Sequence, residues 1–195
     1  MSQQDRRLEV SEAAWRVIVR EGLDRASMRA IAQEMNCTTG VVTHYFRNKQ
    51  ELILFALHQV TERLQVSMQS AIENVEGIDR LATMLLSFLP LDQERQEILR
   101  VWVAFLGYAV GRDGLMEEHR QSAAELRAVI IQELQALQSK GLIQADLVPQ
   151  VEANALLALV NGIGIDTLIQ ANYLGPNQQE AIIHRYIAGM VPGKC

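Results

Sequence analysis

Apolar residues recur at the three- and four-residue spacing of amphipathic helices along almost the whole chain. No stretch of useful length alternates polar and apolar residues as a half-buried β-strand does. Pro90, Pro149 and Pro176 fall at or near the ends of the periodic segments, where helices stop or begin. The pattern predicts an all-α fold built from packed helices.

The first fifty residues divide into short helices whose ends carry recognisable signals. A first helix is expected to end near Gly22, because glycine suits a helix C-cap. Ser27 is a suitable N-cap for a short second helix, and Asn36 suits a left-handed turn after it. Thr38 or Thr39 then caps a third helix of about two turns.

Longer helices are expected in the rest of the chain. Asn48 and Glu51 resemble a capping box that opens a fourth helix, which reaches about Asn74. Further helices are expected at about residues 78–89, 94–111, 115–139, 150–173 and 178–190. We expect a domain line near residue 48, with a small head over residues 1–48 and a larger bundle over residues 49–195.

Charge is distributed unevenly along the chain, whose net charge is −5. Residues 1–50 contain eight Lys or Arg and six Asp or Glu, which leaves an excess of +2. Residues 51–195 contain ten basic and seventeen acidic residues, which leaves −7. The basic excess is therefore confined to the predicted head, as is typical of a region that meets a polyanion.

Cysteine usage and hydropathy bear on the compartment. Cys37 and Cys195 form neither a disulfide framework nor a metal-ligand pattern, which fits a reducing cytoplasm. The N-terminus has no apolar signal core, and the charge-free run between Glu152 and Asp166 is shorter than the roughly 20 residues of a membrane span. We expect a soluble cytoplasmic protein without a membrane partner, a metal or a cofactor.

Small hydrogen-bonding residues gather in the segment TTGVVTHYFRNKQEL, residues 38–52. A DNA-reading head needs one helix in the major groove, which is about 12 Å wide, and a second helix that braces it. Ala32 suits the close crossing of two such helices, and their other apolar residues form a shared core. The polar residues left on the third helix predict a face turned toward a nucleic-acid groove. The alternative is a surface helix whose hydroxyl groups meet only water.

The order of these pieces resembles the TetR family of bacterial transcriptional repressors. A helix is followed by IAQEMNCTTGVVTHYFRNK and then by a long helix that opens KQEL, and the resemblance is specific over residues 8–58. Thr43 departs from the tyrosine of many members, so its role stays open. The resemblance implies phosphate contacts by Lys49 and by the start of the second helix, since helix N-termini favour anions. The predicted DNA-binding residues are Ser27, Met28, Thr38, Thr39, Gly40, Thr43, His44, Tyr45 and Lys49.

The resemblance also implies a ligand-sensing bundle, and TTGVVTHYF and VWVAF look like the choline-responsive, BetI-like branch of the family. Trp102, Phe105 and Tyr108 fall within two turns of one expected helix and, with Phe88, could line one cavity. Such rings suit a flat apolar ligand or a cation held on ring faces, and Asp166 lies near this pocket or near a subunit seam. The alternative for these rings is ordinary core packing.

The segment ANALLALVNGIGIDTLIQANYLG is apolar nearly all round, as is typical of a central or interface helix. Together with EAIIHRYIAGMV it could form a four-helix seam across a two-fold axis, the way TetR relatives dimerise. The alternative is the core of a monomer. The predicted interface residues are Leu156, Leu159, Gly162, Ile163, Ile183, Tyr186 and Ile187.

Enzyme readings find no support in the residues. The four histidines are scattered, and there is no His-Glu-x-x-His zinc motif and no nucleophile elbow. The prediction is a ligand-responsive bacterial repressor that is not an enzyme. It would bind a palindromic operator in double-stranded DNA as a homodimer, with a small-molecule effector in its C-terminal bundle. The alternative is an all-helical dimeric scaffold or adaptor that does not bind DNA.

Overall fold

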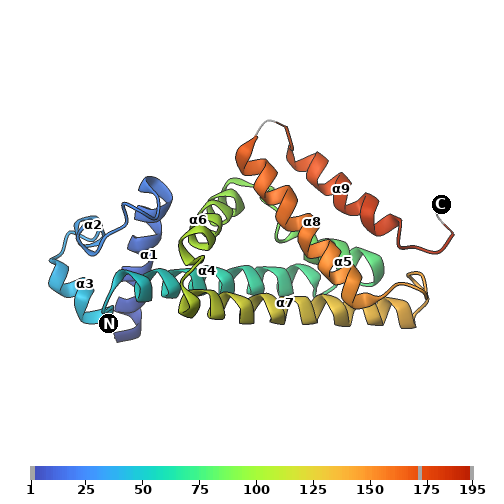
Figure 1. Ribbon diagram of the computed structural model, residues 1–195, viewed down its shortest axis with the longest axis horizontal. Coiled ribbons are helices and arrows are strands. Elements are labelled where there is room, and N and C mark those ends of the chain that lie inside the picture. The colour runs from blue at the N-terminus through green and yellow to red at the C-terminus, as the bar shows by residue number, and fades with distance from the viewer. Residues whose placement is uncertain (1–2, 171–172, 194–195) are drawn as a thin grey trace. The chain divides into compact units, whose positions relative to one another are not determined.

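The computed structural model describes residues 3–170 and 173–193, and every regular element within these ranges is an α-helix (Figure 1). The prediction of an all-α fold is therefore confirmed. In chain order the helices are α1 (Gln3–Glu21), α2 (Met28–Glu34), α3 (Thr39–Tyr45), α4 (Lys49–Ile72), α5 (Gly77–Leu86), α6 (Gln93–Ala109), α7 (Asp113–Ser139), α8 (Pro149–Ile169) and α9 (Pro176–Ala188).

The chain forms two compact units. The first, called the head unit here, comprises Met1–Arg63 and Arg100–Leu115, and the second, called the bundle unit, comprises Leu64–Leu99 and Met116–Cys195. The boundaries thus fall inside α4, α6 and α7 rather than at the start of α4. The line expected near residue 48, where a DNA-binding head would end, is a different division and stays a prediction.

The expected start and stop signals form the short helices of the head unit. The amide of Gly22, at φ 86°, donates to the Ile18 carbonyl at 2.8 Å and closes α1. The Ser27 hydroxyl accepts from the Ala30 amide at 3.1 Å and caps α2. Asn36 adopts the left-handed conformation at φ 51°, which turns the chain toward α3.

The start of α4 differs in one detail from the expected capping box. Asn48 accepts from the Glu51 amide at 2.9 Å, which is the expected half of the motif. The Glu51 carboxylate accepts from the Arg47 amide at 2.9 Å, one residue before the expected partner. The two bonds still cap the helix, because each satisfies a backbone donor at its N-terminus.

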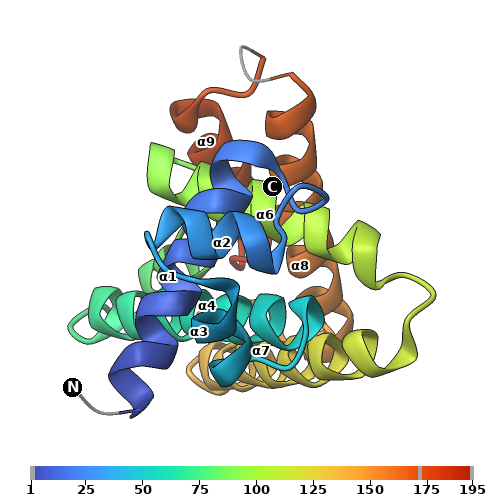
Figure 2. The same ribbon diagram turned by 90° about the vertical axis from the view of Figure 1, so that its left-hand side faces the viewer.

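The helices α1, α2 and α3 contact one another and pack around a core of their own. Figure 2 shows the three helices together. Ala13, Ala14 and Val17 of α1 are fully buried, as is Val42 of α3. Ala32 of α2 is buried too, as a small residue at a close helix crossing would be. Each helix therefore has one face inside this core and one face outside it.

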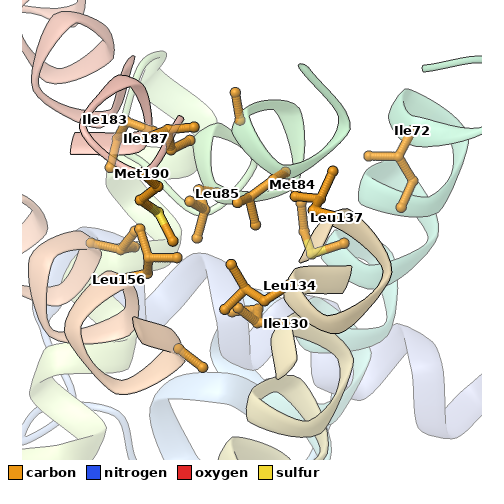
Figure 3. Close-up of a cluster of buried hydrophobic side chains, with 14 of the residues drawn as sticks. Ile72, Met84, Leu85, Ile130, Leu134, Leu137, Leu156, Ile183, Ile187 and Met190 are labelled. Atoms are coloured by element: carbon orange, nitrogen blue, oxygen red, sulfur yellow. The ribbon is translucent and has the colours of Figure 1, made fainter. Parts of the chain in front are cut away.

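The bundle unit has a separate apolar core, and side chains from α5, α7, α8 and α9 converge there in Figure 3. Leu85, Leu134 and Leu156 are among its fully buried members. The loop between α7 and α8 is held by the side-chain amide of Gln138. Its Nε2 atom donates to the backbone carbonyls of residues 144, 145 and 147, at 2.9–3.2 Å. The same loop is joined to the segment after α9, because the backbone amide of Gln144 donates to the Met190 carbonyl at 2.9 Å.

Helix α8 accounts for the most apolar segment of the chain. Among the described residues it is the one helix long and apolar enough to cross a membrane by length and composition. The helix reaches this length only with Glu152 and Asp166 included, and the charge-free run between them is shorter, as expected. Its buried residues, Ala153 and Leu156 among them, belong to the core of the bundle unit, and core helices are commonly this apolar.

Candidate nucleic-acid interface

The polar face of α3 lies on the surface, as expected of a recognition helix. Val42 points into the core of the head unit and is fully buried. The exposed residues of this surface are Thr38, Thr39, Gly40, Thr43 and His44. Tyr45 is half-buried, and its ring meets the His44 ring edge-on with the two centroids 4.9 Å apart. The helix therefore offers hydroxyl groups, a methyl-bearing surface and an imidazole to a partner outside the chain.

Gly40 is a glycine that the fold itself does not require. A Cβ atom built there would meet only the Thr38 Oγ1 atom within 4 Å, at an ordinary 3.6 Å, and the residue has no left-handed φ. Alanine would favour the helix by about 1 kcal/mol relative to glycine. The missing side chain leaves room at the helix surface, which suits close approach of a partner to the backbone of α3.

Thr43, one turn further along α3, uses its hydroxyl group inside the helix. The Oγ1 atom donates toward the carbonyls of Thr39 and Gly40, at 3.1 Å and 3.2 Å. Threonine hydroxyl groups in helices commonly bond back to the preceding turn in this way. The side chain remains exposed, so its methyl group is the part that is not engaged by the chain.

The N-terminus of α2 is a small anion site at most, because the helix has only seven residues. The Ser27 hydroxyl is exposed and accepts from the backbone, and Met28 is half-buried. Positive charge near this helix comes from the exposed Arg25 and Arg29, which sequence reasoning did not single out. The local excess of basic residues in the first fifty positions was the available signal for them.

Lys49, the predicted phosphate contact at the start of α4, also has partners within the chain. Its ammonium group donates to the Leu23 carbonyl at 2.6 Å and lies 3.3 Å from the Asp24 carbonyl. It therefore fastens the turn between α1 and α2 to the first residue of α4. An ammonium group has three donors, so one remains for an anion, and the phosphate contact stays a prediction.

A cation holds the end of α3 against α1 and α4. The Arg7 guanidinium lies 4.9 Å from the centroid of the Phe46 ring and 4.8 Å from that of Phe55. It also approaches the Glu51 carboxylate at 3.4 Å. Phe46, directly after α3, is fully buried. Sequence reasoning missed this joint, because Arg7 is far from both rings in the chain.

A second ionic link braces α2 against α1. The Glu34 carboxylate accepts from Arg16 at 3.0 Å and from Arg20 at 2.9 Å. Hydrogen bonds from Arg16 and then from Arg20 lower the pKa of the Glu34 carboxyl group below its ordinary value. Glu34 is the last residue of α2, so the link holds the end of the bracing helix.

The predicted ligand residues fall in both compact units. Trp102, Phe105 and Tyr108 lie on the part of α6 that belongs to the head unit, with Phe105 buried and the other two half-buried. Phe88 packs against the core of the bundle unit, and Asp166 is exposed on α8. A shared cavity for these residues stays a prediction.

The Tyr108 ring already holds a cation from the chain. The guanidinium carbon of Arg112 lies 4.1 Å from the ring centroid. The same side chain donates to the Tyr108 carbonyl. A cationic ligand on this ring face would therefore have to displace the Arg112 side chain.

Four of the predicted dimer residues are buried within a single chain. Leu156, Ile163, Ile183 and Ile187 are at most 5% exposed and belong to the core of the bundle unit. Buried side chains have no surface left for a partner. Periodicity could not separate core from interface on α8, because this helix is apolar on nearly every face.

The remaining predicted dimer residues retain some surface. Leu159 and Tyr186 are half-buried, and Tyr186 donates to the Glu152 carboxylate at 3.0 Å. Burial and this bond raise the pKa of the Tyr186 hydroxyl group. Gly162 is exposed and lies on a stripe of α8 with regular spacing. The stripe consists of Val151, Ala158, Gly162, Ile165 and Ile169.

Comparisons with known proteins identify the same family of regulators along most of the chain. The model for bacterial regulatory proteins of the tetR family matches residues 11–55, and the model for the C-terminal part of BetI-type transcriptional repressors matches residues 77–192. The HTH-type transcriptional regulator PksA of Bacillus subtilis (strain 168) is 27% identical over 93% of this chain and 88% of its own length. The HTH-type transcriptional regulator BetI of Vibrio vulnificus (strain YJ016) is 26% identical over 93% and 90%.

Solved structures share the fold. A candidate transcriptional regulator from Pseudomonas aeruginosa PAO1 has a TM-score of 0.82 at 26% identity, covering 99% of this chain and 93% of its own. A candidate transcriptional regulator from Saccharomonospora viridis, solved in complex with choline, has a TM-score of 0.89 at 18% identity, covering 96% of this chain and 98% of its own.

Among the described residues, no group of three or more His, Cys, Asp or Glu is placed to hold a metal ion.

The contacts of Lys49 predict a structural role that is measurable without DNA. Replacing Lys49→Met keeps most of the aliphatic stem and removes the bonds to the two loop carbonyls. We expect the free energy of unfolding to fall by about 1.5 kcal/mol, as for hydrogen bonds made by charged groups. Urea denaturation measures this loss, and hydrogen exchange should become faster at the Ala26 amide, which closes the same turn.

Arg47→Met is the matched control, because the Arg47 side chain is 92% exposed. It should leave both measurements near those of the wild type. A Lys49→Met protein as stable as the wild type, with unchanged exchange at Ala26, would show that the loop does not depend on the ammonium group.

Proposed function

The chain belongs to the TetR family and is a transcriptional regulator, and from this premise we propose that it is a repressor that binds a palindromic operator as a homodimer. The observation that carries the proposal is the exposed polar face of α3, braced by α2 and α1 within a head that has a basic excess. As a DNA-binding regulator of bacterial type, the protein acts in the cytoplasm.

In the proposed complex, the α3 helices of two protomers enter successive major grooves, about 34–36 Å apart on one side of the duplex. Thr38, Thr39 and His44 meet base edges, and Gly40 allows the backbone to approach closely. Phosphates are held by the start of α2, the spare donor of Lys49 and the neighbouring arginines. The cationic groups supply affinity without sequence preference, whereas α3 supplies the preference.

The proposed dimer uses the exposed stripe of α8 together with α9. Its small and apolar residues, Ala158 and Gly162 among them, permit close approach of a second copy of the helix. Ile165 and Ile169 are 44% and 70% exposed, which is costly for apolar side chains unless a partner covers them. Leu156, Ile163, Ile183 and Ile187 lie in the core of the bundle unit and are not part of this face.

The effector of the proposed repressor is a small cation, held among Trp102, Phe105 and Tyr108. The choline complex of the related fold and the relatives named BetI support this choice. The Arg112 guanidinium lies on the Tyr108 ring, so in this proposal the effector takes the place of that side chain. A desolvated cation over such a ring can gain about 2 kcal/mol. A neutral aromatic or lipophilic effector is the rival.

The effector acts by binding one conformation of the dimer more tightly than the other. Coupling between two sites is typically about 1–3 kcal/mol, which is about 5- to 150-fold in operator affinity. Helices α4, α6 and α7 each contribute residues to both compact units, so they are the covalent connections through which such a preference would pass between the units.

The DNA-binding role is tested by selecting duplex fragments from the genome with the purified protein. We expect enrichment of fragments that share an inverted repeat, and the logarithm of affinity should fall linearly with the logarithm of salt concentration. Lys49→Ala should weaken binding evenly across sequences, whereas His44→Ala should also change the preferred sequence. Failure to enrich any duplex would contradict the repressor function and favour the scaffold alternative.

The dimer face is tested with Gly162→Glu. A Cβ atom at Gly162 would meet nothing within 4 Å, so the chain itself can accommodate the new side chain. An unpaired charge in an apolar interface costs several kcal/mol, so we expect monomers in sedimentation analysis and weak operator binding. The matched control is Gly107→Glu, because Gly107 is also helical and equally open. A Gly162→Glu protein that stays dimeric would place the interface elsewhere.

The cationic effector is tested with Trp102→Leu, which keeps part of the apolar volume and removes the ring face. We expect the wild type to bind choline or betaine aldehyde in calorimetry and to change its operator affinity in response. The variant should fold, dimerise and bind operator but lose that response. A wild type that shows no heat and no response at millimolar choline would exclude the cationic effector and leave the repressor function intact.

A further inference from the structure

The Thr43 side chain combines an exposed position on the recognition helix with a hydroxyl group already used inside the chain. We propose that Thr43 is a specificity-determining residue that recognises thymine through its methyl group and does not donate a hydrogen bond to DNA. The proposal rests on the proposed repressor function, because it requires α3 to lie in a DNA groove.

The hydrogen-bond geometry decides which part of Thr43 faces a partner. A threonine hydroxyl has one proton to donate, and here two carbonyls of the preceding turn share it, at 3.1 Å and 3.2 Å. Shared bonds of this kind are common at helix ends. While the proton is held there, it is not available to a phosphate oxygen or to an acceptor on a base edge.

This arrangement also removes an energetic obstacle to binding. A hydroxyl group that loses its hydrogen bond to water on entering a dry interface costs about 1–3 kcal/mol, judged from protein variants. The Thr43 hydroxyl keeps its internal acceptors when water leaves, so this cost does not arise for its donor. The methyl group gains from the same loss of water, because apolar surface is favoured in a dry interface.

Thr43 is exposed, and the neighbouring helical position toward the start of α3 carries no side chain. Residues three apart are neighbours on a helix surface, and the residue three before Thr43 is Gly40, which has no side chain. Thymine is the base that presents a methyl group in the major groove, and apolar contacts of threonine with it are a recognised form of base readout. The methyl group of an exposed threonine beside an open backbone is therefore matched to thymine rather than to phosphate.

The test compares two variants that divide the side chain. Thr43→Val keeps the methyl group and replaces the hydroxyl with a second methyl, and Thr43→Ser keeps the hydroxyl and removes the methyl. The probe is the duplex that the wild type selects from a random-sequence library, resynthesised with deoxyuridine in place of thymidine at one position at a time. Uracil differs from thymine only by the missing methyl group, so the ratio of affinities reports methyl contact alone.

At one position per half-site we expect the wild type to prefer thymine by about fourfold, the equivalent of one buried methyl group. Thr43→Val should retain this ratio, and Thr43→Ser should bring it close to one. Thr61→Ser is the control, because Thr61 is an exposed threonine of α4 whose hydroxyl also bonds to the preceding turn, at 2.9 Å from the Leu57 carbonyl, and it has no part in the proposed DNA contact. It should leave the ratio at that position unchanged. Circular dichroism would verify that all three variants fold.

Other results would overturn the proposal. A Thr43→Ser protein that keeps the thymine preference, or a wild type indifferent to every uracil, would show that the methyl group reads nothing. Loss of the ratio in Thr43→Val with retention in Thr43→Ser would assign readout to the hydroxyl. A wild type that selects no duplex would refute the repressor function itself, and this inference with it, before any Thr43 variant is compared.

Discussion

The recognition helix is seven residues long, and this shortness is the constraint on which the rest of the head depends. Isolated helices shorter than about 12–15 residues are marginal in water, so α3 cannot keep its own shape or direction. Its order must come from tertiary contacts at its two ends and along one face. The contacts described above supply this, with Val42 in the core and Phe46 buried directly after the last turn.

The polar links of the head unit serve the same requirement. Arg7 bridges α1 to the rings that flank the start of α4, Glu34 ties α2 to α1, and Lys49 holds the turn before α2. Exposed ion pairs contribute little each to stability, typically about 0–1 kcal/mol. Their value here is geometric, because each fixes the position of an element that contacts or braces α3. None of these three links uses a side chain on the outward face of α3.

Helix α8 shows the opposite situation, because this long helix has more apolar surface than the core of its own unit covers. Its buried residues complete the core of the bundle unit, and its second apolar stripe remains exposed. Two apolar faces on one helix are difficult to satisfy within a single small bundle. In a symmetric dimer a second copy of the chain can cover this stripe with its own identical stripe, because a two-fold interface uses the same surface on both subunits. The proposed dimer follows from this excess of apolar surface.

The sequence by itself determined the helices, their ends and the polar face of α3. Signals such as Ser27, Asn36 and Asn48 act over three or four residues, so they can be read without knowledge of the fold. Only the tertiary structure decided the partners of Arg7 and Lys49 and the inward face of α8. Lys49 bonds to carbonyls 25 and 26 residues away, and no local pattern specifies such a pairing. A helix that is apolar all round has no periodic signal to choose between its own core and a partner, so packing makes that choice.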